Sequence, residues 1–265
     1  MSQSLPSSDK PYIIHQREHG IVTLTLNRGD RLNPLSEEML AALQSAIDAI
    51  AVDSDVRLVV LAAQGKAFCA GHDLKQMRSE PSADYYKSLF HRCSQLMLAI
   101  QRMPQPVIAR VHGLATAAGC QLVSMCDLAV ASTEARFAVS GVNYGLFCST
   151  PSVGLSRNVP RKQAMEMLLT GEFIDAHTAK ERGLVNRVVA PELLDQEISV
   201  LANSILAKPA VAIAMGKQLF YRQLEMGIAA AYQLAGENMA CNMMDEAALE
   251  GVQAFIEKRS PSWKI

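Results

Sequence analysis

The sequence has no long hydrophobic run and no marked excess of charge of either sign. No stretch free of charged residues approaches the ~18 apolar residues that a membrane-spanning helix needs. The 265-residue chain carries 25 basic and 26 acidic side chains, so its formal charge is −1, which argues against a generally basic nucleic-acid-binding protein. We therefore expect neither a membrane nor a nucleic acid among its partners.

Patterns of paired cysteines are also missing. None of the six cysteines belongs to a Cys-x-x-Cys pair, and a chain of this length has a core that needs no disulfides, so we expect reduced thiols and no metal site. Residues 1–11, MSQSLPSSDKP, contain no apolar signal segment and no arginine. We expect this stretch to be a disordered tail and the protein to be cytoplasmic.

Strand and helix patterns alternate through the first two thirds of the chain. Strand patterns cover residues 12–17, 21–27, 57–63, 107–111 and 127–132, and helix patterns cover residues 36–50 and 83–101. Such alternation predicts an α/β fold in which helices return over a sheet. We assign residues 12–205 to this core.

The last part of the chain favours helix almost throughout. A break at Lys208-Pro209 places a boundary near residue 206 and leaves residues 206–265 as a helical C-terminal region. This region has apolar residues on several faces: Leu219, Leu224, Ile228, Leu234, Met239, Met243 and Met244. A lone helical tail would expose too much apolar surface, so we expect the region to pack on another body or another subunit.

Two loops have the residues needed to bind a polarised carbonyl. Residues 66–75, KAFCAGHDLK, and residues 113–121, GLATAAGCQ, each carry small residues between a predicted strand and a helix start. Free N–H groups at helix starts donate to anions or polarised oxygens, and one N–H from each loop would form an oxyanion hole. Small residues in such turns also serve close packing alone, so the residues by themselves leave both interpretations open.

Both loops, with two later segments, resemble the crotonase, or enoyl-CoA hydratase/isomerase, superfamily. The matching segments are FCAGHDL, VIARVHGLATAAGCQLVSMCDLAVAS, LLTGEFIDAHTAKERGLVNRVV and EGVQAFIEKR, in the family's order and spacing. The resemblance implies a spiral of ββα units with a C-terminal helical trimerisation region, assembled as a homo-oligomer, a trimer or a hexamer of two trimers. It also implies a role in fatty acid metabolism with an acyl-CoA thioester as partner, so that coenzyme A enters as part of the substrate and no separate cofactor is needed.

The resemblance assigns site residues position by position. The thioester carbonyl would lie between the backbone N–H groups of His72 and Ala118. The residues on the coenzyme A side would be Ala70, His72, Asp73, Leu74, Lys75 and Ala118, with Lys258 reaching over from a neighbouring subunit.

The sequence departs from the family at the two positions that activate water. Hydratases of this family carry a glutamate at each, whereas this chain has Gln121 and Gly141. Glutamine orients a water but does not usefully accept its proton, and glycine does neither. Of the other polar candidates, Tyr144 is interpreted as a packed side chain and Cys148 as an inert buried thiol.

Three functions are consistent with these residues. The first is a lyase-type acyl-CoA enzyme of the enoyl-CoA hydratase kind, with hydratase turnover doubtful. The second is another thioester reaction on the same oxyanion hole, a decarboxylation or a thioester hydrolysis. The third is a non-catalytic acyl-CoA-binding or regulatory protein that keeps the loops without the carboxylates.

Overall fold

A six-stranded sheet forms the centre of the fold in the computed structural model, which describes residues 10–263. Most of the predicted disordered tail therefore lies outside the described residues. The strands, in spatial order, are β1 (Ile13–Glu18), β2 (Ile21–Leu26), β3 (Leu58–Ala63), β5 (Val107–Val111), β7 (Leu128–Ser132) and β10 (Arg187–Val189). β1 and β2 form an antiparallel hairpin, and the other neighbours pair in parallel.

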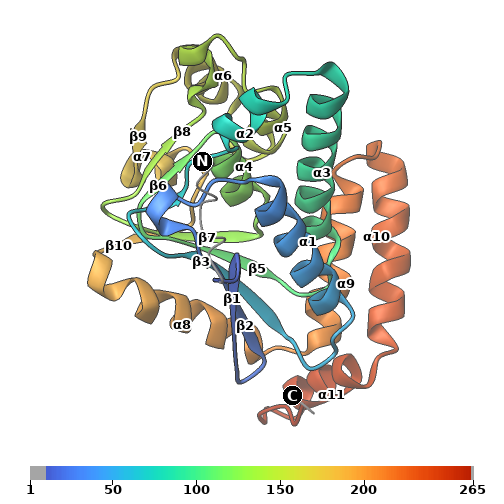
Figure 1. Ribbon diagram of the computed structural model, residues 1–265. Coiled ribbons are helices and arrows are strands. Elements are labelled where there is room, and N and C mark those ends of the chain that lie inside the picture. Colours follow the sequence, from blue (N-terminus) through green and yellow to red (C-terminus); the bar gives the residue numbers. More distant parts are fainter. Residues whose placement is uncertain (1–9, 264–265) are drawn as a thin grey trace.

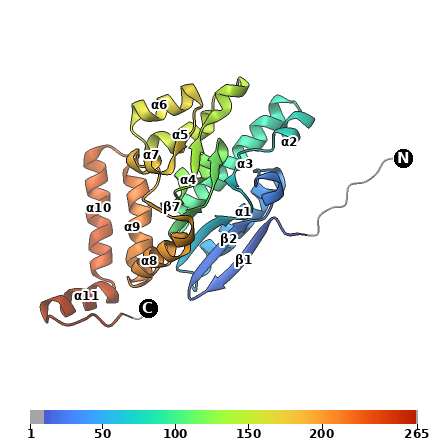
Figure 2. The same cartoon turned by 90° about the vertical axis from the view of Figure 1, so that its left-hand side faces the viewer.

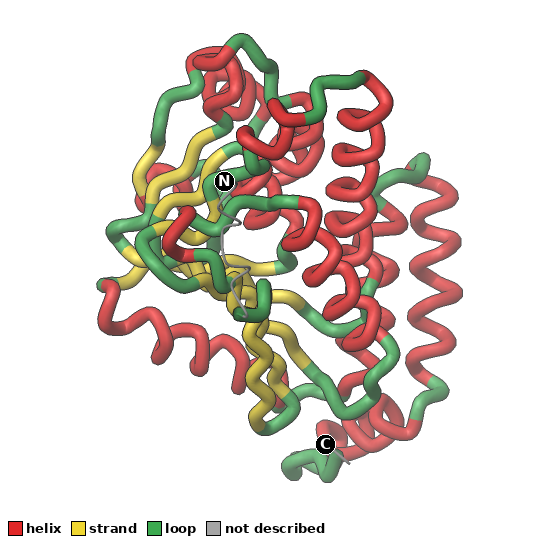
Figure 3. Tube along the Cα trace, viewed as in Figure 1, coloured by secondary structure: helices red, strands yellow, loops and turns green. Residues whose placement is uncertain are grey.

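Helices cover both faces of this sheet (Figures 1 and 3). One face packs against α1 (Glu37–Ala51) and α3 (Ala83–Arg102), and α8 (Leu194–Leu206) covers part of the other. Alternate residues of β3 serve the two faces, since Val59 faces the first core and Val60 the second. Burial on both faces explains the uninterrupted apolar run of β3, and the α/β prediction is confirmed.

A second, smaller sheet follows from strands that the sequence patterns did not predict. Its order is β4 (Ala67–Cys69), β6 (Leu114–Thr116), β8 (Arg136–Ala138) and β9 (Ile174–Asp175), with only the last pair antiparallel. The remaining shorter elements are η1 (Gly29–Arg31), α2 (Leu74–Ser79), α4 (Ala118–Met125), η2 (Ser140–Tyr144), α5 (Ser149–Asn158), α6 (Arg161–Thr170), α7 (Ala176–Glu181) and η3 (Pro191–Leu193).

Three helices form the C-terminal region: α9 (Ala210–Gln223), α10 (Ile228–Met243) and α11 (Glu246–Ile256). α8 ends at Leu206, so the break in helix falls at the expected boundary; the division into separate domains stays a prediction. α9 and α10 run side by side along one flank of the molecule (Figure 2). Within residues 10–263 no single helix has the length and apolarity of a membrane span, and Pro191–Leu206 with Ala210–Gln223 meet both conditions only as a pair bent by 101°.

The C-terminal helices bury very little of their own apolar surface. α9 has no buried apolar residue, and α10 and α11 have one each, Ala231 and Ala254. We call the exposed apolar residues of this region the C-terminal apolar face: Phe220, Leu224, Met226, Ile228, Tyr232, Met239, Met243, Met244, Leu249, Val252, Phe255 and Ile256. Exposed apolar residues that gather in one patch are typical of a surface that contacts another molecule.

A buried ion pair attaches α9 to the core. Lys217 Nζ lies 2.7 Å from Asp127 Oδ2 and also donates to the carbonyl oxygens of Ile100 and Gln105. The Tyr221 hydroxyl donates to the other oxygen of Asp127 over 2.8 Å. Burial lowers the pKa of Lys217, and the neighbouring carboxylate opposes that shift.

Candidate functional site

The two loops singled out in the sequence meet at the start of α4. Because β4 and β6 pair in parallel, the loops that follow these two strands leave the small sheet at the same edge. The first loop then turns at Gly71, whose φ of +92° favours glycine. A Cβ built on Gly71 would lie 3.0 Å from the Ala117 Cβ and 3.4 Å from the Ala118 nitrogen, so the loops touch there. On the other side of Ala118, a Cβ on Gly119 would collide with the Cys69 carbonyl oxygen.

The first loop is held by the segment that precedes α1. Leu35 N–H donates to the Gly71 carbonyl over 2.7 Å, and Ala70 N–H donates to the Leu32 carbonyl over 3.0 Å. Leu35 and Leu32 could not be predicted as part of the site, because an isolated bridge between Leu35 and His72 leaves no periodic signal in the sequence.

The His72 ring packs against Phe90 of α3. Its Nδ1 lies 3.2 Å from the Leu35 carbonyl oxygen, and its ring centroid lies 5.6 Å from that of Phe90. Burial lowers the pKa of His72, against a smaller opposing effect of the contact with Leu35, so the ring is neutral near pH 7. The ring is therefore a packing group, and the main-chain N–H is the part of His72 left to serve the site.

The other residues expected on the coenzyme A side, Ala70 and residues 73–75, lie next to His72 in the sequence. Asp73 caps α2, since its Oδ1 accepts from the N–H groups of Lys75 and Gln76 over 2.9 and 3.1 Å. Its position is thus explained by helix capping. Leu74 is 57% exposed and Lys75 is exposed, whereas Ala70 is half-buried.

Lys258 is not brought to these loops within its own chain. It follows α11 at the opposite end of the molecule from α2 (Figures 1 and 2). A contact between Lys258 and a ligand at the loops would have to come from another copy of the chain, as the resemblance implies.

The second loop presents the first N–H of α4. Ala118 opens the helix, where the initial N–H groups have no intrahelical acceptor. Among residues 10–263, neither Ala118 N–H nor His72 N–H has an acceptor in the protein. Ala117, just before the helix, has the unusual backbone angles φ +51° and ψ −121°. Each of the two touching loops therefore has one main-chain donor without an acceptor in the protein.

The two positions that carry glutamate in hydratases hold Gln121 and Gly141 here, and both are enclosed by the surrounding protein. Gln121 is 4% exposed, and its buried Oε1 has no hydrogen-bond partner among the described residues. Gly141 is enclosed: a Cβ there would overlap the Leu146 carbonyl oxygen and lie 2.8 Å from Cys148 Sγ. The turn is closed by Leu146 N–H donating to the Gly141 carbonyl and by Gly141 N–H donating to Cys148 Sγ. Position 141 therefore has no room for a side chain in this conformation.

The nearby thiols do not replace the carboxylates. Burial raises the pKa of Cys69 and Cys120 to about 12, and it also raises the pKa of Cys148. These thiols stay protonated near neutral pH and are poor nucleophiles. Tyr144 is 76% exposed, so its interpretation as a packed side chain was wrong.

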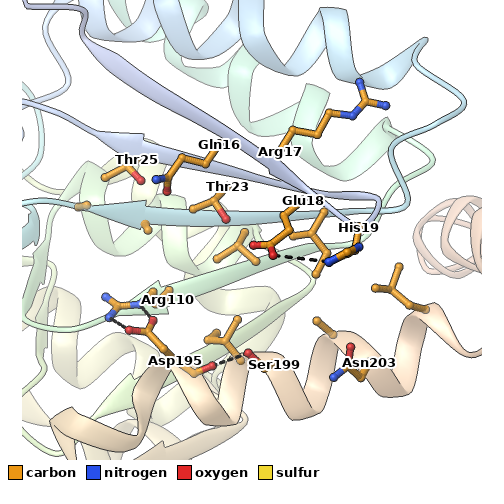
Figure 4. A pocket seen from close by; sticks show the side chains of 17 residues that line it. Gln16, Arg17, Glu18, His19, Thr23, Thr25, Arg110, Asp195, Ser199 and Asn203 are labelled. Atoms are coloured by element: carbon orange, nitrogen blue, oxygen red, sulfur yellow. Dashed lines mark hydrogen bonds and ion pairs between the residues drawn. The ribbon is translucent and has the colours of Figure 1, made fainter.

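No other cluster among the described residues competes with the loops. No group of three or more His, Cys, Asp or Glu side chains in residues 10–263 is arranged to hold a metal ion. A groove of about 920 Å³ lies between the β1–β2 hairpin and α8, with the Arg110–Asp195 ion pair on one wall (Figure 4). None of the predicted site residues lines it.

Comparison with known proteins supports the assignment made from the motifs. The family model described as enoyl-CoA hydratase/isomerase matches residues 16–265. A solved structure of enoyl-CoA hydratase from Mycobacterium smegmatis is 65% identical with a TM-score of 0.95, covering 97% of this chain and 100% of that one. The human enoyl-CoA hydratase domain-containing protein 3 structure is 43% identical with a TM-score of 0.92, covering 96% and 100%.

A relative from Xenopus laevis, enoyl-CoA hydratase domain-containing protein 3, mitochondrial, is 47% identical over 96% of this chain and 86% of its own length. That relative is described as mitochondrial, which gives no support to the cytoplasmic location expected from the sequence. The structural likeness confirms the crotonase-type fold. With the family model covering nearly the whole chain, this protein belongs to the enoyl-CoA hydratase/isomerase family.

Proposed function

We propose that the protein binds an acyl-CoA thioester with its carbonyl oxygen between the N–H groups of His72 and Ala118, and that it is a poor hydratase. The observation that carries this proposal is the pairing of two free N–H donors with positions 121 and 141, which hold no carboxylate. Coenzyme A would lie along residues 70–75.

The physical argument rests on where charge develops. A thioester enolate concentrates negative charge on its oxygen, and a donor fixed in advance at that oxygen contributes ~3–4 kcal/mol to stabilising it. Both donors here belong to the backbone, so the hole needs no particular side chain. The proposal therefore rests more firmly on the thioester as ligand than on any one reaction of that thioester.

The reaction must manage without the two glutamates. Hydration needs a base for the attacking water and an acid for the α-carbon, and each positioned group typically contributes ~10² to 10⁴ in rate. Gln121 provides neither, and the enclosed turn at Gly141 keeps any side chain out of the second position.

This favours, as the second candidate, a reaction that forms the enolate without removing a proton from carbon. Loss of CO2 from a malonyl-type thioester does so directly, because the electrons of the breaking C–C bond enter the enolate. Thioester hydrolysis and binding without turnover are the remaining alternatives.

A mass-spectrometric panel separates these possibilities. Purified protein is incubated with crotonyl-, malonyl- and 3-hydroxybutyryl-CoA, and binding of each thioester is measured by calorimetry. Binding with little or no hydration of crotonyl-CoA supports the proposal. Failure to bind any thioester would refute it, and release of CO2 from malonyl-CoA would select the second candidate.

We further propose that the C-terminal apolar face is covered by other copies of the chain, in a trimer or a hexamer. These helices of 14, 16 and 11 residues have only two buried apolar residues, both alanines, and exposed apolar patches mark surfaces that contact another chain. Light scattering at micromolar concentration tests this, and a monomer of 28.8 kDa would contradict it.

A further inference from the structure

Ala117 has a backbone conformation that alanine rarely adopts. Its φ of +51° combined with ψ of −121° lies outside the left-handed helical region and falls where glycine is at home. Because ψ of Ala117 sets the plane of the peptide that joins it to Ala118, it also sets the direction of the Ala118 N–H. Relaxation of Ala117 to an ordinary conformation would rotate that donor.

Ala117 and its neighbour Thr116 contact β8 and the residue pair that follows it. Ala117 N–H donates to the Ala138 carbonyl over 2.9 Å, which extends the β6–β8 pairing by one residue. Beside it, Thr116 Oγ1 and Ser140 Oγ lie 2.9 Å apart. Both side chains are buried, at 8% exposure each. Within residues 10–263, each hydroxyl has the other as its only side-chain hydrogen-bond partner.

We propose that the Thr116–Ser140 hydroxyl pair is a positioning device that keeps Ala117 in its unfavourable conformation and so orients the Ala118 N–H. Strained residues persist only where their surroundings over-determine them, and such residues cluster at functional sites. In a buried setting, loss of one hydroxyl leaves the other without a partner, so the pair acts as a unit. This inference rests on the proposed function, because it concerns the donor assigned there to the thioester oxygen.

The experiment compares two ligands that differ only at the carbonyl. Butyryl-CoA has the thioester oxygen, whereas S-butyl-CoA is a thioether without it. The ratio of their dissociation constants, measured by calorimetry, therefore reports the oxyanion hole apart from coenzyme A binding. For the unmodified protein we expect butyryl-CoA to bind about tenfold more tightly or better, as expected for two hydrogen bonds to one oxygen.

Ser140→Ala and Thr116→Val should each reduce this ratio toward one, while the affinity for S-butyl-CoA stays within about twofold. Ser140→Thr and Thr116→Ser keep a hydroxyl and should keep the ratio. Ala117→Gly in the Ser140→Ala background should restore it, because glycine adopts the required conformation without help. A purely structural role for the pair does not predict that rescue.

Ser132→Ala is the matched control, since it removes another buried hydroxyl, which donates to the His112 carbonyl from β7. It should lower stability and leave the ratio unchanged. A ratio that survives in both Ser140→Ala and Thr116→Val overturns the inference and leaves the proposed function standing. A ratio near one in the unmodified protein would show that no oxyanion hole binds the thioester oxygen, and both proposals would then be wrong.

Discussion

Gly141 provides a sharp test, because it is the place where the family's second carboxylate would have to stand. A Cβ at this position meets the Leu146 carbonyl oxygen, a backbone atom that does not swing aside, as well as the Cys148 sulfur at 2.8 Å. Overpacking of this kind costs about 1–3 kcal/mol and occasionally more. Because the first obstacle is backbone, we expect Gly141→Ala to lie at or above the top of that range, about 3 kcal/mol.

Denaturant unfolding at fixed protein concentration measures this cost. Gly236→Ala serves as control: it lies inside α10 with open space around it, so it should be neutral or gain up to ~1 kcal/mol from helix propensity. The same geometry predicts that Gln121→Glu combined with Gly141→Glu does not create a hydratase. A side chain at position 141 would displace the turn through Leu146, so the two carboxylates would not be held around one water. A Gly141→Ala protein within about 0.5 kcal/mol of the unmodified chain would refute this reasoning.

Other consequences are open to direct measurement. Ala118→Pro removes the proposed donor at a helix position that tolerates proline, so it should abolish the preference for butyryl-CoA over S-butyl-CoA; a folded variant that keeps the preference excludes Ala118 as donor. His72→Ala should keep that preference but lower the unfolding free energy by about 1–2 kcal/mol, as a lost buried ring does. Lys217→Met leaves Asp127 buried without its cation and should cost about 3–5 kcal/mol in denaturant unfolding, whereas a change below about 1 kcal/mol would contradict the buried pair. Burial lowers the pKa of His72 and His112, so the unfolded chain binds more protons below pH ~6.5 and stability should fall as pH decreases from about 7 to 5, less steeply in His72→Gln.

Long elements were predictable from the sequence because their periodicity extends over many residues. The helix from residue 83 and the buried strand near residue 58 lie within one or two residues of their predicted bounds. The helix pattern that begins at residue 36 starts at the true N-cap of α1, since Ser36 Oγ accepts from Met39 N–H over 3.3 Å. The second sheet was missed because strands of two or three residues are too short to show alternation.

The site was predictable only in part, for a similar reason. Motifs located the two loops and the two substituted positions along the chain. They carried no signal for contacts between distant segments, such as Leu35 with Gly71 or Thr116 with Ser140. Nor did they show that Gly141 is enclosed, because that depends on how the turn through Leu146 folds back.

The central claim is that this chain keeps the thioester-binding loops without the groups that activate water. Steady-state loss of the 2-enoyl absorbance of crotonyl-CoA with the unmodified protein tests it most directly. With only the hole and proximity left, we predict turnover several orders of magnitude below the median enzyme rate of ~10 s⁻¹. Turnover near that median would contradict the account and show that another group in this site activates water.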